Sequence, residues 1–107
     1  MINEKPNINY IQELSGGDIS FEKKVIEIIK KEFPEEVKIY LNNYNLKKFK
    51  KCAENVHKLK HKISILGLGK SYEIAVVYEN NLNEGSDALH EEFGRILQIM
   101  AHYLTTL

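Results

Sequence analysis

The chain has 107 residues, of which 43% are hydrophobic and 28% charged, a balance typical of a globular domain. Fifteen basic and fifteen acidic residues give a formal net charge of zero, which favours neither nucleic acid nor a membrane surface as a partner. Cys52 is the only cysteine, so an internal disulfide is excluded and a cytoplasmic location is expected. No apolar run has the length of a signal peptide or a membrane span, and we expect residues 1–107 to form a single domain.

Apolar residues recur with helical spacing along the whole chain. A short first helix is expected to end before Gly16 and Gly17, because glycine readily takes the left-handed conformation that closes a helix. Asp18 is then a good N-cap for a second helix. Pro34 falls inside that helix and is expected to kink it or to interrupt it briefly. The apolar residues assigned to the inner faces of these two helices are Ile8, Ile11, Leu14, Phe21, Val25, Ile28, Ile29, Phe33, Val37, Tyr40, Leu41 and Tyr44.

Three more helices are predicted in the rest of the chain. Asn45 is expected to cap the third helix, and the glycines within residues 67–69 to close it. The fourth is expected to stop within residues 80–85, and Ser86 or Asp87 to cap the fifth. Because the connections are short, we expect an all-α fold: an up-and-down antiparallel four-helix bundle with a short extra N-terminal helix. The inner faces of these helices are assigned to Phe49, Cys52, Val56, Leu59, Ile63, Leu66, Ile74, Ala75, Tyr78, Leu82, Leu89, Phe93, Ile96, Leu97, Met100 and Leu104.

The third predicted helix places His57 on a flank that faces solvent. At about 100° per residue, the apolar residues of that helix gather roughly a third of a turn or more away from the His57 direction. One turn earlier lies Ala53, which is too small to block a molecule that approaches the ring. One turn later lies Lys60. The residues that surround the His57 direction are Lys50, Ala53, Glu54, Lys60, His61 and Ser64.

His57 and Lys60 together favour one kind of chemistry. An unperturbed imidazole is largely neutral near pH 7 and is then a competent nucleophile. It can accept a phosphoryl group from an acyl phosphate, a reaction that needs only alignment and charge stabilisation. An ammonium group one helical turn away can pair with the phosphoryl oxygens. Since the sequence has no glycine-rich phosphate loop and no nucleotide-binding fingerprint, we expect no ATP-dependent kinase activity.

A series of short motifs extends over most of the chain. In order they are Leu14-Ser15-Gly16-Gly17-Asp18 followed by Phe21, Phe33-Pro34-Glu35, His57-Lys58-Leu59-Lys60, Leu66-Gly67 and Tyr78-Glu79. With these motifs the chain resembles the histidine-containing phosphotransfer (HPt) domains, the intermediate carriers of multistep phosphorelays. The third motif matches the His-x-Leu-Lys of that family, and the last stands where the family usually has Leu-Glu.

The resemblance implies that His57 is the phosphorylated residue and that Lys60 stabilises the phosphate. It implies a phosphocarrier, not an enzyme, which accepts a phosphoryl group from an aspartyl phosphate in one response-regulator receiver domain and passes it to another. A hybrid sensor histidine kinase is a further expected partner. The domain is expected to be a monomer without a cofactor of its own, because the Mg²⁺ is expected in the receiver. The residues expected to line the docking surface are Lys50, Ala53, His61 and Ser64.

His61 departs from the family pattern. After the lysine, the family usually has glycine or another small residue, which lets the rim of the receiver's active site come close. An imidazole is bulkier and, when protonated, adds positive charge beside the phosphate. A second function therefore stays open, in which the chain is a non-catalytic helical interaction module that binds a receiver or kinase without carrying phosphate.

Two other interpretations of this region are weaker. His57 and His61 have the spacing of half a metal site, but Glu54 is the only carboxylate of the same helix that could complete it. Residues 47–62 carry seven lysines, yet they have no arginine and no exposed aromatic residue, so nucleic-acid binding is not expected. This face suits a solvated surface that steers an acidic receiver. The remaining two histidines are expected to be ordinary surface or boundary residues: His90 and His102.

Overall fold

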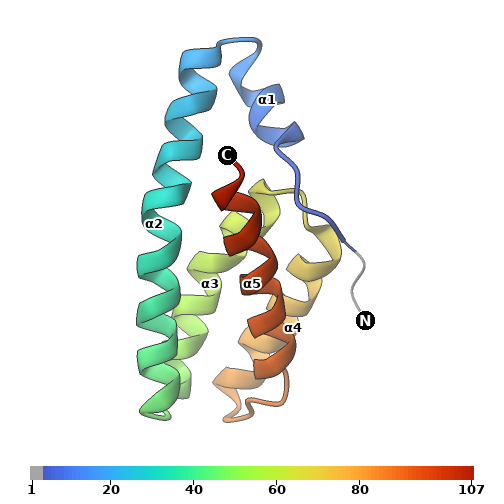
Figure 1. Cartoon of the computed structure of the whole chain (residues 1–107). Helices are drawn as coiled ribbons and strands as arrows, with labels where there is room; N and C mark the ends of the chain where they lie inside the picture. The colour runs from blue at the N-terminus through green and yellow to red at the C-terminus, as the bar shows by residue number, and fades with distance from the viewer. Residues whose placement is uncertain (1–3) are drawn as a thin grey trace.

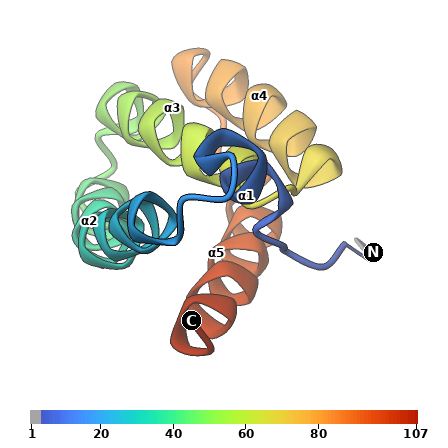
Figure 2. The ribbon, with the colours of Figure 1, turned by 90° about the horizontal axis from the view of Figure 1, so that it is seen from above.

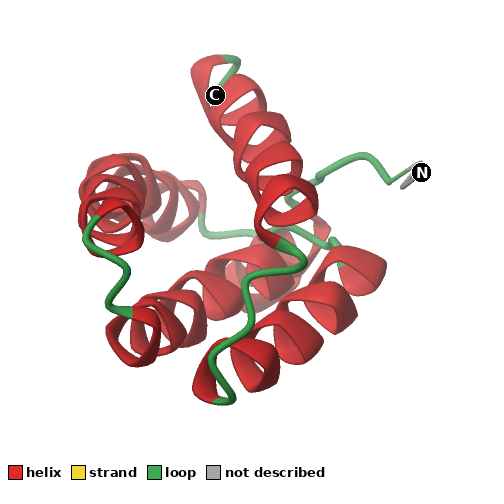
Figure 3. Ribbon diagram, turned by 90° about the horizontal axis from the view of Figure 1, so that it is seen from below, coloured by secondary structure: helices red, strands yellow, loops and turns green. Residues whose placement is uncertain are grey.

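The computed structural model describes residues 4–107, and this part of the chain is helical without any strand (Figure 3). The prediction of an all-α fold is confirmed. None of the helices within residues 4–107 combines the length and the apolarity needed to span a bilayer. In chain order the helices are α1 (Asn9–Ser15), α2 (Ile19–Asn45), α3 (Phe49–Ile65), α4 (Gly69–Asn83) and α5 (His90–Thr105).

The four longer helices form the predicted bundle. Helices α2, α3, α4 and α5 run alternately down and up, and short loops join each to the next (Figure 1). Seen along the bundle, they follow one another around a common centre, and α5 slants outward on the side away from α3 and α4 (Figure 2). Neighbours in sequence are therefore antiparallel neighbours in space, which brings α3 and α4 together along their length.

The short helix α1 closes one end of the bundle (Figure 2). Ile11 is fully buried, and Ile8 just before the helix packs against the core. The backbone N–H of Asn7 donates to the carbonyl oxygen of Leu66, at 2.8 Å, which ties the segment before α1 to the end of α3. Burial of one apolar face of so short a helix supplies most of its stability.

The loop between α3 and α4 is fastened by the same N-terminal segment. Gly67 follows α3 as predicted, with a φ of 76° that favours glycine. Gly69, predicted to close α3, is instead the first residue of α4. The Glu4 carboxylate accepts hydrogen bonds from the backbone N–H groups of Lys70 and Ser71, at 2.8 and 2.7 Å. Glu4 thus satisfies donors at the start of a helix that has no cap from its own neighbouring residues.

The core consists mostly of the apolar residues predicted to face inward. Buried side chains come from every helix, and Cys52 is among them, as expected. Leu41 lies instead on the side of α2 that borders a groove between α2 and α5. Four inward assignments are wrong, since between 43% and 55% of each residue is exposed: Leu14, Phe21, Ile28 and Leu41.

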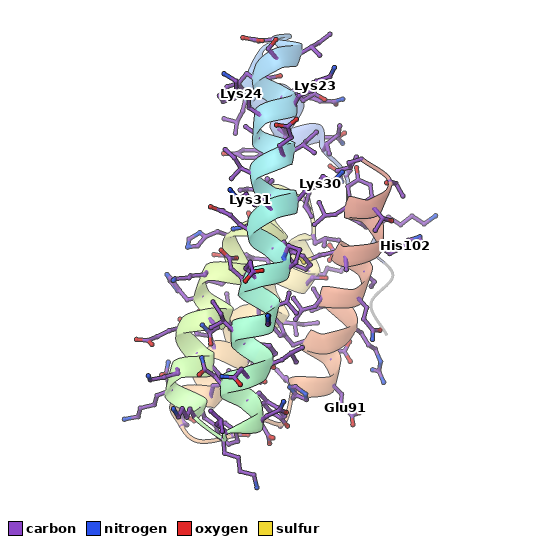
Figure 4. All side chains as sticks on the ribbon, turned by 60° about the vertical axis from the view of Figure 1, so that its left-hand side comes forward. Lys23, Lys24, Lys30, Lys31, Glu91 and His102 are labelled. Atoms are coloured by element: carbon purple, nitrogen blue, oxygen red, sulfur yellow. The ribbon has the colours of Figure 1, made fainter. Side chains whose placement is uncertain are left out.

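The length of α2 explains the exposed side chains near its start. It has 27 residues, against 17 in α3 and 16 in α5, so its first turns extend beyond both (Figure 4). Phe21 and Ile28 belong to this extension, where few helices are present to cover them. Charged side chains keep the same part of α2 in contact with water, including the labelled residues Lys23, Lys24, Lys30 and Lys31 (Figure 4).

The junction between α1 and α2 follows the prediction. Gly16 takes a left-handed conformation with a φ of 56°, and its backbone N–H donates to carbonyl oxygens in the last turn of α1. The Asp18 carboxylate accepts a hydrogen bond from the backbone N–H of Phe21 at 3.1 Å. Asp18 is therefore the N-cap of α2, and it satisfies one of the free donors of the first turn.

Pro34 lies inside α2 without interrupting it, so of the two expected effects, a kink or a brief interruption, the interruption is wrong. A proline removes one backbone hydrogen bond and crowds the preceding turn. Here the ring faces solvent, while Phe33 beside it is buried and Val37 one turn later packs against the core. Packing on both sides of the proline keeps the helix continuous.

Two of the predicted helix caps are wrong. Asn45 is the last residue of α2 and does not cap α3, because the inner face of α2 continues as far as Tyr44. Helix α5 starts at His90, after both Ser86 and Asp87, and no side chain caps it. The Asp87 carboxylate accepts a hydrogen bond from the Tyr44 hydroxyl, at 2.6 Å, and is therefore used between helices.

Candidate functional site

His57, Lys60 and Glu79 meet where α3 packs against α4. The side chain of His57 is 54% exposed, which confirms its predicted position on a solvent-facing flank. The Glu79 carboxylate, on α4, is 3.2 Å from His57 Nδ1 and 3.0 Å from Lys60 Nζ. One carboxylate therefore joins the two residues that the sequence pattern selects. Glu79 belongs to the Tyr78-Glu79 motif, but the sequence alone indicates no function for it.

The contact with Glu79 determines which nitrogen of His57 carries the proton. An ionised carboxylate can only accept hydrogen bonds, so Nδ1 of His57 must be the donor. In a neutral ring the other nitrogen, Nε2, then has a free lone pair. The side chain that carries this nitrogen is more than half exposed, so a molecule from outside the domain can reach the ring.

Lys60 is held more tightly than the sequence suggests. Its side chain is only 13% exposed, and its ammonium group pairs with Glu79. The same nitrogen lies 5.8 Å from the centre of the Tyr72 ring, within the range of a cation–π contact. Lys60 is therefore near His57, as predicted, but its charge is directed at the carboxylate that holds the ring.

A shallow hollow lies beside His57, between α3 and α4. Ala53, predicted to lie beside His57 and to line the docking surface, does line this hollow, but only 3% of the residue is exposed. A small side chain can fit under a neighbouring helix where a larger one would hold the two apart. The lining of the hollow consists of Ala53, Glu54, Asn55, His57, Lys58, Glu79 and Asn83.

The other residues of the predicted docking surface are exposed on α3: Lys50, His61 and Ser64. They do not line the hollow beside His57. His61 nevertheless contacts the candidate site, since its ring centre is 5.2 Å from that of His57 and the two planes are almost perpendicular, at 87°. The structure therefore brings together His57, Lys60, His61 and, at the base, Ala53.

The lysine-rich stretch is less solvated than its composition suggests. Lys62 is buried, and its ammonium group contacts the carboxylates of Glu32 and Glu36 on α2, each at 3.0 Å. Burial disfavours the charged form, but the two carboxylates outweigh it and raise the pKa of Lys62. Together with Lys60, this residue uses its charge inside the domain, which leaves fewer lysines to attract an acidic partner.

His90 lies at the boundary of the core, as predicted, but its contacts are not those of an ordinary boundary residue. Its ring stacks on Tyr44, with ring centres 3.5 Å apart and planes 2° from parallel. Its Nδ1 lies 2.7 Å from the hydroxyl of Tyr40, which in turn contacts the hydroxyl of Tyr78. With Asp87, which accepts from Tyr44, these residues form a tyrosine–histidine cluster that links α2, α4 and the start of α5.

The protonation states in this cluster follow from burial. Burial lowers the pKa of His90, and the nearby carboxylates of Asp87 and Glu91 only partly oppose it. The neutral ring accepts at Nδ1 from the Tyr40 hydroxyl, which leaves Tyr40 able to accept from Tyr78. His90 is thus the acceptor that two buried tyrosine hydroxyls on inner helix faces require. His102, by contrast, is exposed on α5, as predicted (Figure 4).

The site around His57 therefore has a nucleophilic nitrogen, a carboxylate that orients it and cations close by. Within residues 4–107, no three histidine, cysteine, aspartate or glutamate side chains are placed to hold a single metal ion. The pair His57 and His61 thus lacks the further ligands that the metal-binding interpretation requires. Comparisons of the chain with protein families, with curated proteins and with solved structures found no match.

Proposed function

We propose that this domain is a phosphocarrier of the HPt type. His57 accepts a phosphoryl group at Nε2 from an aspartyl phosphate in a response-regulator receiver domain and passes it to another receiver. The observation that carries the proposal is the hydrogen bond from His57 Nδ1 to Glu79, because it leaves Nε2 of this largely exposed side chain with a free lone pair.

The transfer step needs no proton movement in this geometry. The Nε2 lone pair attacks phosphorus, the P–O bond to the aspartyl group breaks, and the aspartate leaves as a carboxylate. The Nδ1 proton stays on the ring, which therefore gains a positive charge. Glu79 stabilises that charge across 3.2 Å, and the reverse step returns the phosphoryl group to a second aspartate.

Lys60 acts in this scheme by holding Glu79 against the ring. Its ammonium group is 3.0 Å from the Glu79 carboxylate. Mg²⁺ is expected to come with the receiver domain, where it neutralises charge on the transferred group. The chain itself contributes the nucleophile and its surroundings. The free energy that drives the transfer comes from the aspartyl phosphate of the donor.

The test is phosphotransfer from a purified, radiolabelled receiver domain. Wild-type protein should gain phosphate that is labile in acid and stable in base, as a phosphoramidate bond is, and His57→Gln should gain none. His102→Gln is the matched control, since it removes an exposed histidine from another helix. Equal labelling of the His57→Gln variant and the wild type would rule out His57 as the acceptor.

A second function is favoured by one observation, the packing of the His61 ring against His57. If this ring keeps the receiver's active site away, the domain is an interaction module that binds a receiver or kinase without carrying phosphate. Calorimetric titration with a receiver, combined with the labelling experiment, separates the two functions. Tight binding without phosphohistidine supports the interaction module, and labelled His57 supports the phosphocarrier.

A further inference from the structure

His61 lies where it can contact a group carried on His57. The two residues are one turn apart on α3, and both side chains are exposed. Side chains on a helix lean toward its N-terminus, which directs the His61 ring toward His57. Their ring centres are 5.2 Å apart and their planes nearly perpendicular, so the rings are neighbours that do not stack face to face.

The side chains near His57 that could donate hydrogen bonds to a phosphoryl group differ in how free they are to do so. Lys60 pairs with Glu79 at 3.0 Å and its side chain is only 13% exposed, so its charge is already partly neutralised and little of it faces solvent. Lys58 is exposed but lines the hollow next to Ala53 and Glu79. His61 is outside this hollow, and no hydrogen bond to its ring occurs within residues 4–107.

An imidazole can donate to phosphate in either protonation state. The neutral ring has one N–H group and the protonated ring has two, and a charged donor makes the stronger hydrogen bond. A phosphoryl group on Nε2 of His57 presents three acceptor oxygens on the exposed side of α3. The lean of His61 toward His57 brings its donor to that side.

We propose that His61 is a further catalytic residue, which binds the phosphoryl group on His57 through an N–H···O hydrogen bond while Lys60 positions Glu79. The proposal rests on the phosphocarrier function, and it gives Lys60 and His61 different roles. His61, the bulky residue at a position where the HPt pattern has a small one, then binds the phosphoryl group. The resemblance alone assigns that role to Lys60.

The test uses phosphoramidate, a small phosphoryl donor, so that docking of a receiver does not enter the measurement. The rate of phosphohistidine formation at His57 is followed by ³¹P NMR on the full chain. His61→Phe keeps an aromatic ring but has no donor, and should slow loading by about tenfold, as expected for loss of a hydrogen bond to a charged group. His61→Arg supplies donors again and should restore most of the rate.

Two matched variants act as controls. Lys58→Gln removes an exposed charge next to His57 in the sequence, and His102→Phe makes the same change as His61→Phe on α5. Both should load at nearly the wild-type rate. Loading of His61→Phe at the wild-type rate overturns the proposal, and so does a loss in Lys58→Gln that equals the loss in His61→Phe.

Failure of this inference can be told apart from failure of the phosphocarrier function. If phosphoramidate loads His57 equally in wild type and His61→Phe, only the role of His61 is lost. If His61 affects loading but no receiver transfers phosphate to His57, the relay is contradicted and the contact is supported. Absence of any loading at His57 in the wild type overturns both. Circular dichroism of each variant verifies that the exposed substitutions leave the helices intact.

Discussion

Replacing Glu79 by glutamine tests the central contact of the proposed site. Glu79→Gln keeps the size of the side chain but removes the charge that faces both His57 Nδ1 and Lys60 Nζ. A glutamine can still accept one hydrogen bond, but its neutral amide cannot compensate the positive charge that the ring gains on phosphorylation. We therefore expect slower phosphotransfer with little change in the fold.

The size of the effect follows from the distance and the exposure. Opposite unit charges 3.2 Å apart attract by about 1 kcal/mol in water and by about 5 kcal/mol at an effective dielectric constant of about 20. Because the His57 side chain is 54% exposed, solvent screening places the contribution near the lower end, at about 1 to 2 kcal/mol. The transfer rate should therefore fall by about tenfold.

Rapid-quench phosphotransfer from a labelled receiver measures this rate directly. Glu73→Gln is the matched control, because Glu73 is an exposed carboxylate on the same helix. It should transfer at the wild-type rate. If Glu79→Gln also transfers at that rate, then the carboxylate neither orients the ring nor stabilises its charge, and the argument from the His57–Glu79 contact is refuted.

Three further predictions concern stability. Lys62→Met leaves the partly exposed Glu36 carboxylate without its cation. The free energy of unfolding, measured in urea, should fall by about 1 to 2 kcal/mol. An unchanged urea midpoint would contradict this prediction. Because burial lowers the pKa of His90, its neutral form stabilises the fold fully above about pH 6.5, and this stability is lost as the pH falls below that value. Unfolding curves at pH 7 and pH 5 should therefore differ less in His90→Phe than in the wild type. Gly67→Ala places a Cβ atom on a residue with a φ of 76° and within 2.6 Å of the Asn7 side chain. The free energy of unfolding should therefore fall by about 1 to 3 kcal/mol, which a lower melting temperature would show.

The fold was predictable because it depends on a repeating property of the sequence. Apolar residues at helical spacing locate the helices, and Asp18 and Gly16 mark one junction correctly. The helix ends that were predicted wrongly depend on contacts between helices. Asp87 could cap a helix, but it accepts a hydrogen bond from Tyr44, and that tyrosine lies on another helix. Local propensity does not decide between two such uses of one side chain.

The candidate site was predictable in part for a similar reason. Helical periodicity alone places His57 on an exposed flank, and the structure agrees. The contact with Glu79 depends on how α3 and α4 are aligned lengthwise, which spacing along one helix does not determine. The same is true of Ala53, which is buried beside residues of α4, and of Lys62, whose ammonium group contacts carboxylates on α2. In each case a neighbouring helix sets the surroundings of the residue, and periodicity along one helix does not predict that neighbour.

The tyrosine–histidine cluster has a practical consequence for spectroscopy. The chain has six tyrosines and no tryptophan, so tyrosine dominates its near-ultraviolet absorption and its emission. Burial raises the pKa values of Tyr40 and Tyr78, and the hydrogen bond to Asp87 raises that of Tyr44 to about 12. Tyr40 and Tyr78 should therefore resist ionisation in alkali until the helices separate, whereas Tyr44 should ionise near pH 12. Absorbance during an alkaline titration reports, without any attached label, when α2, α4 and α5 come apart.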